Sequence, residues 1–509
     1  MTGKRNILAT FLAVAAATLV ISTTTAQQPS PIATLTREII SDAALPGIDR
    51  GLREIPTPST QITADALHDQ LARIAQSYLP DSLIVKFRPG TTLTASRSML
   101  ALVDGTSSVS VPNADFDIVT MSPGVDPEAA ASRLAAQPDV EYAQARYIIR
   151  PRFVPNDPLY PQQWNFPLID MEHAWDINPG ATSSIIVAVI DTGVAYRGGL
   201  VRFSTTNPFA QQEFPGTTFV DLPFAAAPEL GPSTRFVSPR DFIFNDTTPF
   251  DMFGHGTHVS GTIGQLTNNG MGVAGMAFNV SIMPVKAVGD FWDFIFTGQT
   301  GTDDTVAQGI RYAVDNGAKI LNLSIGRTGP PSPVLQSALT YAVSRGAFAA
   351  VAAGNDFLNG NPVERPADLG PQIDGVMTVG AVGRNRQRAV YSNTGAQVEI
   401  TAPGGDQFVN GLTGGILQQT FDEDFVLPAT GAPRFDTFVY AYEQGTSMAT
   451  AHVSGFAALL MQQGITDPAA VEAAIKKFAT DLGTAGRDDQ FGNGLINVRN
   501  ALRGMGLAR

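Results

Sequence analysis

The sequence predicts an α/β protein with a mostly parallel central sheet flanked by helices, preceded by a small α+β unit. Two observations predict the larger part. Continuous apolar and β-branched runs, such as residues 185–190, are typical of strands buried on both faces. These runs alternate with segments of helical length that end at glycine, which is the rhythm of parallel βαβ units. Short strand patterns interleaved with two helical segments predict the small unit.

The small unit begins near Ser82. The Arg-Pro-Gly sequence at residues 88–90 ends its first strand. Asp126, Pro127 and Glu128 open its second helix, because proline and acidic residues are favoured at a helix N-terminus. We expect strands over residues 83–87, 116–119 and 140–149, and helices over residues 95–102 and from residue 126.

The larger unit follows a basic, proline-rich linker at residues 150–158, which we expect proteases to reach. Gly317 and Gly346 each close a helical segment shortly before a buried strand. We expect strands over residues 185–190, 319–324 and 347–353, and helices over residues 303–316 and 333–345.

The composition is that of a globular, acidic protein. The chain has 509 residues, of which 44% are hydrophobic and 16% charged, so it can build a large core. Its net charge of −13 argues against the basic patch that binds nucleic acid, and we expect no nucleic-acid partner. The chain has no cysteine, which excludes disulfides, thiolate metal sites and a cysteine nucleophile.

The N-terminus has the three parts of a secretory signal peptide. Lys4 and Arg5 precede an apolar run over residues 7–21, and small and polar residues follow to residue 27. The apolar run is shorter than the roughly 20 residues that a spanning helix needs. We therefore expect a secreted protein, extracellular or periplasmic, with no membrane anchor in its mature form. A loosely ordered leader with one helix near residues 64–77 should follow.

Two polar residues stand where a parallel sheet binds its ligands, beyond the C-terminal ends of strands. Asp191 directly follows a buried strand, although a lone aspartate there is often only a turn former. His255 lies in a glycine-rich segment where a helix can begin. His258 raises the alternative of a metal site, but the zinc-protease pattern His-Glu-x-x-His is not present. We therefore interpret His258 and His452 as structural, hydrogen-bonded histidines.

A serine stands at the start of a third segment. Gly445, Thr446 and Ser447 precede a long apolar stretch, so the hydroxyl should lie at the beginning of a buried helix. The free N–H groups and the dipole of such a helix stabilise an anion. The α/β-hydrolase pattern Gly-x-Ser-x-Gly is not matched, because Ala449 replaces its second glycine.

Together the three segments resemble the signatures of the subtilisin-like serine proteases (subtilases, peptidase S8), in that family's order. The resemblance extends from about residue 157 to residue 502 and implies a subtilisin-like fold. It implies a serine endopeptidase (EC 3.4.21.-) in which Ser447 attacks the peptide carbonyl, His255 transfers the proton and Asp191 orients the imidazolium. Ala451 replaces a proline usual in the family, which changes backbone stiffness but removes no reacting group.

The resemblance also implies how a polypeptide substrate is held. Asn355 matches the asparagine that stabilises the oxyanion together with the backbone N–H of the serine. Two other segments are similar to the family's substrate-binding segments: Ser324, Ile325 and Gly326, which pair with an extended substrate backbone, and Ala352, Ala353 and Gly354, which form a wall of the pocket for the residue before the cut. The small residues of that wall would leave room for a large apolar side chain.

Residues 82–149 are similar to the family's ferredoxin-like inhibitory propeptide, of the inhibitor I9 type. The resemblance implies that this prodomain assists folding, inhibits the enzyme intramolecularly and is cut off within residues 150–156. The expected organisation is a signal peptide over residues 1–26, a leader and inhibitory propeptide over residues 27–152, and a catalytic domain over residues 153–509, active as a monomer.

No cofactor is expected for catalysis, but a structural calcium ion could bind. Residues 266–273 resemble the family's calcium loop, with Asn269, Met271 and Val273 as its possible ligands. The family's partner aspartate has no clear counterpart near Gly198. The long segments at residues 201–240 and 407–439 suggest no function.

Three alternatives stay open. The protein could be an inactive binding protein with this fold, although no triad or oxyanion residue is lost. It could be an esterase that uses the same acyl-transfer residues. It could also be a dedicated inhibitor or chaperone, in which the small unit is the functional part.

Overall fold

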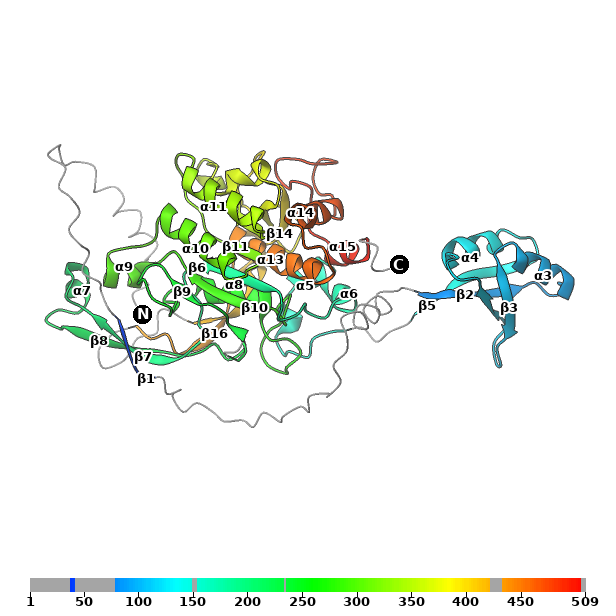
Figure 1. Cartoon of the computed structure of the whole chain (residues 1–509), viewed down its shortest axis with the longest axis horizontal. Coiled ribbons are helices and arrows are strands. Elements are labelled where there is room, and N and C mark those ends of the chain that lie inside the picture. The colour runs from blue at the N-terminus through cyan, green and yellow to red at the C-terminus, as the bar shows by residue number, and fades with distance from the viewer. Residues whose placement is uncertain (1–36, 42–77, 149–152, 233–234, 422–432, 505–509) are drawn as a thin grey trace. The chain divides into compact units, whose positions relative to one another are not determined.

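The computed structural model describes residues 37–41, 78–148, 153–232, 235–421 and 433–504 (Figure 1). The predicted signal peptide and the helix expected near residues 64–77 lie outside the described residues. No helix within the described ranges is long and apolar enough to cross a membrane.

The small unit is a four-stranded antiparallel sheet with two helices. Its strand order is β3-β4-β2-β5, and the elements follow one another as βαββαβ, which is the ferredoxin-like arrangement. Its core contains Leu83, Val85, Val119 and Leu134. The elements are β2 (Tyr78–Phe87), α3 (Leu93–Ala101), β3 (Gly105–Ser110), β4 (Asp117–Met121), α4 (Pro127–Ala135) and β5 (Val140–Tyr147).

The α+β prediction for this unit is confirmed, but the sequence reading missed strand β3. Residues 105–110 read Gly-Thr-Ser-Ser-Val-Ser, and most of them are exposed. A strand is recognised in a sequence by alternating or continuous apolar residues. The segment has neither, so only its pairing with β4 makes it a strand.

The larger unit contains a seven-stranded sheet in the order β14-β13-β12-β11-β6-β10-β9, with every pair parallel. This confirms the predicted parallel sheet. The predicted strands and helices agree with the structure to within about one residue at each end. The strands are β6 (Ile186–Asp191), β9 (Arg240–Asp241), β10 (Ser281–Lys286), β11 (Ile320–Leu323), β12 (Phe348–Ala352), β13 (Val376–Val382) and β14 (Ile400–Pro403).

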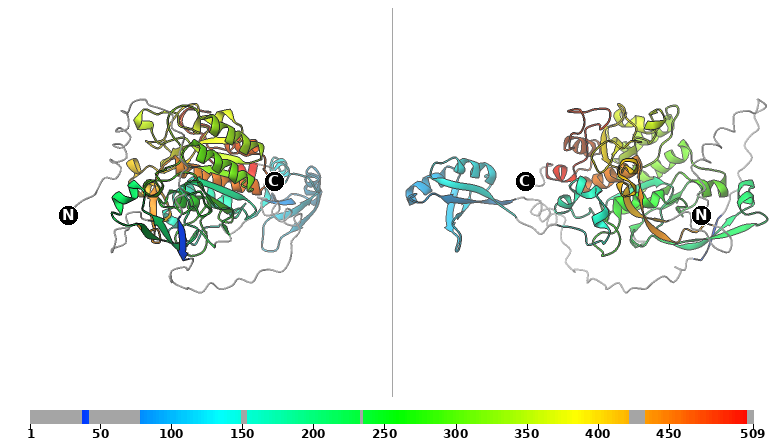
Figure 2. Two further views of the ribbon diagram at one scale, coloured as in Figure 1. Left: turned by 60° about the vertical axis from the view of Figure 1, so that its left-hand side comes forward. Right: turned by 180° about the vertical axis from the view of Figure 1, so that it is seen from behind.

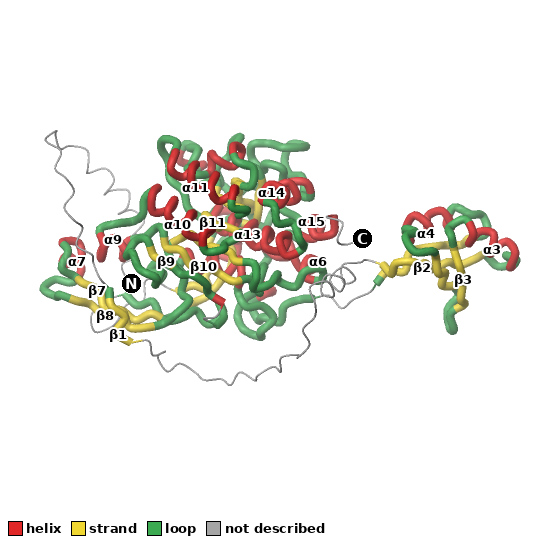
Figure 3. The backbone as a smooth tube through the Cα atoms, viewed as in Figure 1, coloured by secondary structure: helices red, strands yellow, loops and turns green. Residues whose placement is uncertain are grey.

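Helices cover both faces of this sheet (Figures 2 and 3). Along β6, Val187 and Val189 belong to the core beneath α8 (His255–Gly264) and α13 (Thr446–Gln462). The alternate residues Ala188 and Ile190 belong to the core beneath α10 (Asp303–Asp315) and α11 (Pro333–Ser344). Both faces of β6 are therefore buried, which is why its sequence is continuously apolar.

Two smaller sheets use the long segments for which the sequence suggested no function. Strands β7 (Gly199–Ser204) and β8 (Phe219–Phe224) form an antiparallel pair, as do β15 (Ile416–Phe421) and β16 (Phe438–Glu443). The other helices are α5 (Asn165–Leu168), α6 (Met171–Trp175), α7 (Pro208–Glu213), α9 (Phe291–Thr297), α12 (Gln407–Asn410), α14 (Pro468–Lys477) and α15 (Val498–Gly504).

Part of the leader is ordered, whereas the sequence suggested only a loose segment. Strand β1 (Glu38–Ser41) pairs antiparallel with β7. The preceding Arg37 is buried, with Nη2 2.6 Å from Asp241 Oδ2 and Nε 2.7 Å from Asp246 Oδ2. Its guanidinium lies 4.2 Å from the centre of the Phe244 ring. A buried charge needs such partners, and both carboxylates come from the chain more than 200 residues later.

Candidate functional site

The residues singled out in the sequence lie at one edge of the parallel sheet. Strands β12, β11 and β6 are neighbours, and their C-terminal ends lead directly to Asn355, Ser324 and Asp191. Helices α8 and α13 pack against each other and begin with His255 and with Thr446-Ser447. The edge therefore combines polar strand ends with two helix N-termini, as ligand sites in open parallel sheets do.

Asp191 and His255 form a hydrogen-bonded pair in which Asp191 is buried and His255 is partly exposed. The Asp191 side chain is 0% exposed, and its Oδ1 lies 2.7 Å from His255 Nδ1 and 2.7 Å from the Thr192 N–H nitrogen. Burial lowers the pKa of His255, but the Asp191 carboxylate more than offsets this and raises that pKa to about 9. Because a ring nitrogen that faces a carboxylate carries the proton, Nε2 is the nitrogen able to accept another.

A glycine lets the start of α8 approach Asp191. A β-carbon at position 256 would lie 2.0 Å from the Gly193 carbonyl oxygen and 3.3 Å from the Asp191 β-carbon. The Gly256 N–H also donates to Thr192 Oγ1 at 3.0 Å. The glycine next to His255 is therefore required by the close contact between α8 and the turn after β6.

Ser447 is the second residue of α13 and is 8% exposed. Its hydroxyl donates to the Ser324 carbonyl at 3.0 Å, and the Ser324 hydroxyl donates to the Ser447 carbonyl at 2.8 Å. The hydroxyl can turn toward another acceptor by rotation about one side-chain bond, and catalytic hydrogen bonds often form only when substrate is bound.

The amide nitrogen of Asn355 lies close to the start of α13, near the Ser447 backbone nitrogen. Its Oδ1 accepts from the Thr446 N–H at 2.9 Å and from the Thr446 hydroxyl at 3.0 Å, which fixes the amide and turns Nδ2 away from Thr446. A β-carbon at Gly445 would lie 3.6 Å from both Asn355 Nδ2 and the Ser447 backbone nitrogen. Two N–H donors therefore converge near Gly445, as an oxyanion requires.

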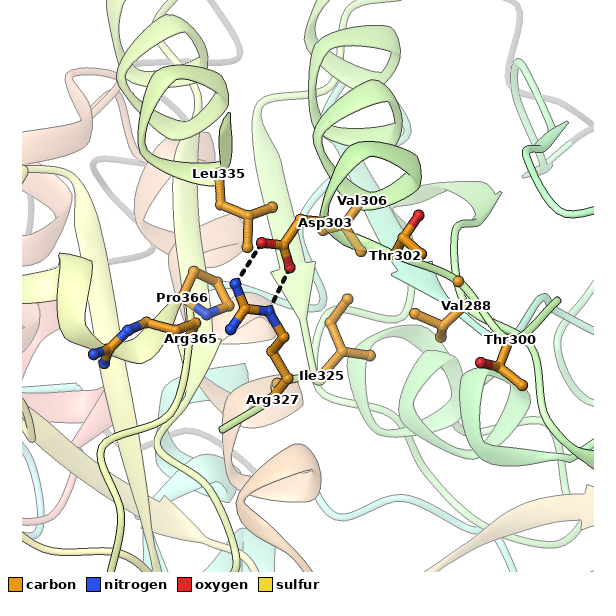
Figure 4. A pocket seen from close by; sticks show the side chains of 12 residues that line it. Val288, Thr300, Thr302, Asp303, Val306, Ile325, Arg327, Leu335, Arg365 and Pro366 are labelled. Carbon is orange, nitrogen blue, oxygen red and sulfur yellow. Dashed lines mark hydrogen bonds and ion pairs between the residues drawn. The ribbon is translucent and has the colours of Figure 1, made fainter. Parts of the chain in front are cut away.

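The segment after β11 borders a cavity of about 440 Å³ (Figure 4). Ile325 and Gly326, both predicted to bind substrate, contribute to its lining. Arg327 and Asp303 form a two-bonded ion pair in it, with Nε–Oδ1 at 2.6 Å and Nη2–Oδ2 at 2.5 Å. The rest of the lining is largely apolar and includes Val288, Val306 and Leu335. The sequence did not predict this ion pair, because Asp303 on α10 and Arg327 after β11 belong to no common motif.

A buried carboxylate that the sequence reading missed lies behind the predicted pocket wall. Glu364 is 8% exposed. A β-carbon at Gly354 would lie 2.1 Å from its Oε1, and one at Gly326 would lie 2.5 Å from its Oε2. Burial and, secondarily, the charge of Asp356 raise the pKa of Glu364 to about 7. The wall made of Ala352, Ala353 and Gly354 is thus not purely apolar.

The loop that resembles a calcium site surrounds two carboxylates. Glu229 and Asp157 are 1% and 2% exposed, and among the residues that the structure describes no group forms a hydrogen bond with Glu229 Oε1 or Asp157 Oδ1. The second oxygen of Glu229 accepts from the Val273 N–H at 3.2 Å, and that of Asp157 accepts from the Asn268 N–H at 2.7 Å. Burial, with a smaller contribution from Asp157, raises the pKa of Glu229 to about 7.

This set of oxygens fits a hard cation such as calcium. The sequence shows no carboxylate for this loop near Gly198, whereas the structure has the buried Glu229 next to it. The Asn269 side-chain oxygen accepts from the Met271 N–H at 2.8 Å. Within the described ranges no three histidine, aspartate or glutamate side chains form a metal cluster, so further ligands would have to be amide and carbonyl oxygens.

The other two helix histidines have structural contacts. His258 Nε2 lies 3.1 Å from the Ile416 carbonyl oxygen, and His452 Nδ1 lies 2.8 Å from that of Met448. Burial lowers the pKa of His258 to about 3 and that of His452 to about 4. Both rings are therefore neutral at pH 7 and hold neighbouring segments together.

Two family models match the chain. The model described as the subtilase family (Peptidase S8) matches residues 182–494, and the model of the fervidolysin N-terminal prodomain matches residues 65–145. The inhibitor I9 type expected from the sequence is not supported by the second match.

Several curated proteins are similar over most of the chain. A thermophilic serine proteinase of Bacillus sp. (strain AK1) is 31% identical over 455 residues, which cover 88% of this chain and 92% of the relative. Thermitase of Thermoactinomyces vulgaris is 31% identical over 69% of this chain and its own full length. An extracellular protease of Xanthomonas campestris is 30% identical over 74% of this chain and 61% of its own.

Among solved structures, that of a lanthipeptide protease superposes with a TM-score of 0.50 at 20% sequence identity. It covers 70% of this chain and 100% of its own. At this level of identity the likeness shows the fold.

Proposed function

Because the chain belongs to the subtilase family and is a subtilisin-like serine proteinase with a prodomain, we propose that it is a secreted endopeptidase made as a zymogen. Ser447 is the nucleophile, His255 the general base and acid, and Asp191 the group that orients His255. The observation that carries the proposal is the Asp191–His255 pair at the sheet edge where Ser447 stands in the first turn of α13.

The reaction proceeds in two halves. His255 Nε2 accepts the Ser447 hydroxyl proton while Oγ attacks the peptide carbonyl carbon, and the carbonyl oxygen becomes an anion. The Asn355 amide and the Ser447 backbone N–H donate to that anion. The imidazolium then gives its proton to the leaving amine, and an acyl-enzyme forms. Water, deprotonated by His255, hydrolyses the acyl-enzyme and Ser447 regains its proton.

Asn355 supports the oxyanion in this proposal, so Asn355→Ala should lower kcat by about 10²- to 10³-fold with little change in KM. Steady-state kinetics on a peptide substrate measures this. Asn359→Ala is a suitable control, because Asn359 is an exposed asparagine nearby that bonds Asp356 rather than the site. A change in KM alone would indicate that Asn355 serves ground-state binding.

An esterase could use the same catalytic groups. Comparing the cleavage of protein and ester substrates separates the esterase hypothesis from the peptidase hypothesis. A peptidase should degrade denatured protein efficiently as well as small esters, whereas an esterase should cleave only the esters. The segment at residues 324–326 favours the peptidase, because the extended backbone of a peptide substrate can pair with a segment of this kind. An inactive binding protein should cleave neither substrate.

Maturation is proposed to separate residues 27–152 from the catalytic domain, residues 153–509. The backbone nitrogen of Phe153 donates to Asp176 Oδ1 at 2.8 Å, and its ring packs against Trp175 and Phe278. A cut directly before Phe153 would turn this nitrogen into an ammonium group next to the Asp176 carboxylate. The new N-terminus would then be held by an ion pair as well as by ring packing.

Calcium is proposed to stabilise the fold through Asp157, Glu229 and the loop with Asn269, Met271 and Val273. A cation at about 100 times its Kd would add roughly 2.7 kcal/mol to the free energy of unfolding. We expect chelation to lower the Tm by roughly 3–4 °C, as measured by calorimetry on the Ser447→Ala variant, which cannot digest itself. Glu229→Gln should remove most of this calcium dependence. An equal Tm with calcium and with chelator would exclude the site.

A further inference from the structure

We propose that this enzyme cleaves after arginine or lysine, because the Glu364 carboxylate lies at the inner end of the pocket that receives the side chain before the cut. The inference rests on the proposed function of Ser447 and Asn355. It differs from the apolar preference that the small wall residues alone suggested.

The pocket is placed by contacts around Ser447. The segment after β11 is tied to Ser447 by the two Ser324 hydrogen bonds of 3.0 and 2.8 Å. The segment after β12 is tied to the same helix start, because the Gly354 N–H donates to Thr446 Oγ1 at 3.2 Å. A substrate carbonyl held by Ser447 and Asn355 therefore lies between these two segments, and the preceding side chain enters between them.

Glu364 spans both walls of this pocket. Its two oxygens lie at 2.1 and 2.5 Å from where β-carbons of Gly354 and Gly326 would be. The segment that carries Glu364 is fixed beside the β11 wall, because Arg327 and Arg365 exchange two backbone hydrogen bonds of 3.0 and 2.8 Å. Only glycine at positions 326 and 354 leaves room for this carboxylate.

The carboxylate has no cationic partner. Within the part of the chain that the structure describes, no ion pair includes Glu364; its carboxylate accepts only from neutral groups, the Asn393 amide at 3.4 Å and the Asn355 backbone N–H. The nearby Asp356 adds negative charge. Arg327 is paired with Asp303 at 2.5 Å, and Arg365 Nε lies 3.5 Å from Asp368 Oδ2. None of the described residues therefore supplies a positive charge that pairs with Glu364.

A substrate side chain can supply it. An arginine or lysine that enters the pocket forms a charge-assisted hydrogen bond with Glu364, and such bonds are stronger than those between neutral groups. A phenylalanine or leucine would instead cover a carboxylate without pairing it, which is costly. The expected discrimination in kcat/KM is on the order of 100-fold, and a site built for a polar group can exceed this.

The test compares peptides that differ only in the residue before the cut, with arginine, lysine, phenylalanine or leucine there. Mature wild-type enzyme should favour arginine and lysine by about 100-fold in kcat/KM. Glu364→Gln keeps the size of the side chain and should lower the arginine-to-phenylalanine ratio by a similar factor. Asp374→Asn is the control, because Asp374 is exposed and precedes β13 at the opposite end of the sheet, so it should leave the ratio unchanged.

The pH dependence of wild type gives a second readout that needs no variant. Because the pKa of Glu364 lies near 7, its carboxylate gains charge as the pH rises through that value, and the arginine-to-phenylalanine ratio should rise with it. Cleavage of both substrates depends on the protonation of His255 in the same way, so this dependence cancels in the arginine-to-phenylalanine ratio. A ratio near one at every pH would overturn the inference while leaving the endopeptidase intact. Failure to cleave any peptide or protein would instead contradict the proposed function.

Discussion

Ser447→Ala should abolish turnover. Removal of the triad serine lowers kcat by roughly 10⁶-fold in subtilisin, because the acyl-enzyme can no longer form. We expect a loss of this order here, measured with a peptide substrate under conditions where each wild-type molecule turns over many times. Ser281→Ala is a suitable control, since it removes another buried hydroxyl, one that donates to the Ser183 carbonyl at the N-terminal end of β10.

The same variant tests maturation. If Ser447 cuts its own prosegment, the Ser447→Ala precursor should keep its full mass, whereas wild type loses the segment before about residue 153. Intact mass and N-terminal sequencing of both proteins measure this. Equal processing of both forms would mean that another protease performs the cut, and it would contradict self-processing without contradicting the endopeptidase activity.

Asp191→Asn should have the second largest effect, a loss in kcat of about 10⁴-fold. The amide cannot stabilise an imidazolium and favours the wrong ring tautomer. Folding should survive, because the substitution is isosteric, and thermal melting checks this.

The pH profile of this variant gives an independent readout. In wild type the Asp191 carboxylate raises the pKa of His255 above its usual 6.5, to about 9. Since neutral His255 is the base, activity should rise as the pH rises through that raised pKa. In Asp191→Asn the acidic limb of kcat/KM should move to lower pH. An unchanged limb would mean that another group controls it.

Much of the fold could be predicted because its signals are local. Residues 186–191 are continuously apolar up to the aspartate, so these six residues are enough to predict both the buried strand and its polar end. Helix α13, which carries Ser447 in its first turn, is likewise predicted by a glycine followed by a long apolar run. Strand β3 was not visible, because its residues are polar and exposed and only β4 holds them in the sheet.

The parts of the site that could not be predicted depend on contacts between distant segments. Glu364 reaches Gly326 and Gly354 only because a loop after β12 returns beside the end of β11. Glu229 approaches the loop at Val273 from a segment that follows β8. Arg37 finds its two carboxylates far along the chain. In each case the residue stands in no motif, so its role emerges only once the chain is folded.

Covalent labelling tests the central claim most directly. The mature enzyme is treated with a fluorophosphonate, which reacts with an activated serine, and the modified residue is located by peptide mass spectrometry. Our account predicts a single label on Ser447, formed in step with loss of activity and strongly slowed in His255→Ala. A label on another serine, or full inactivation with Ser447 unmodified, would contradict it.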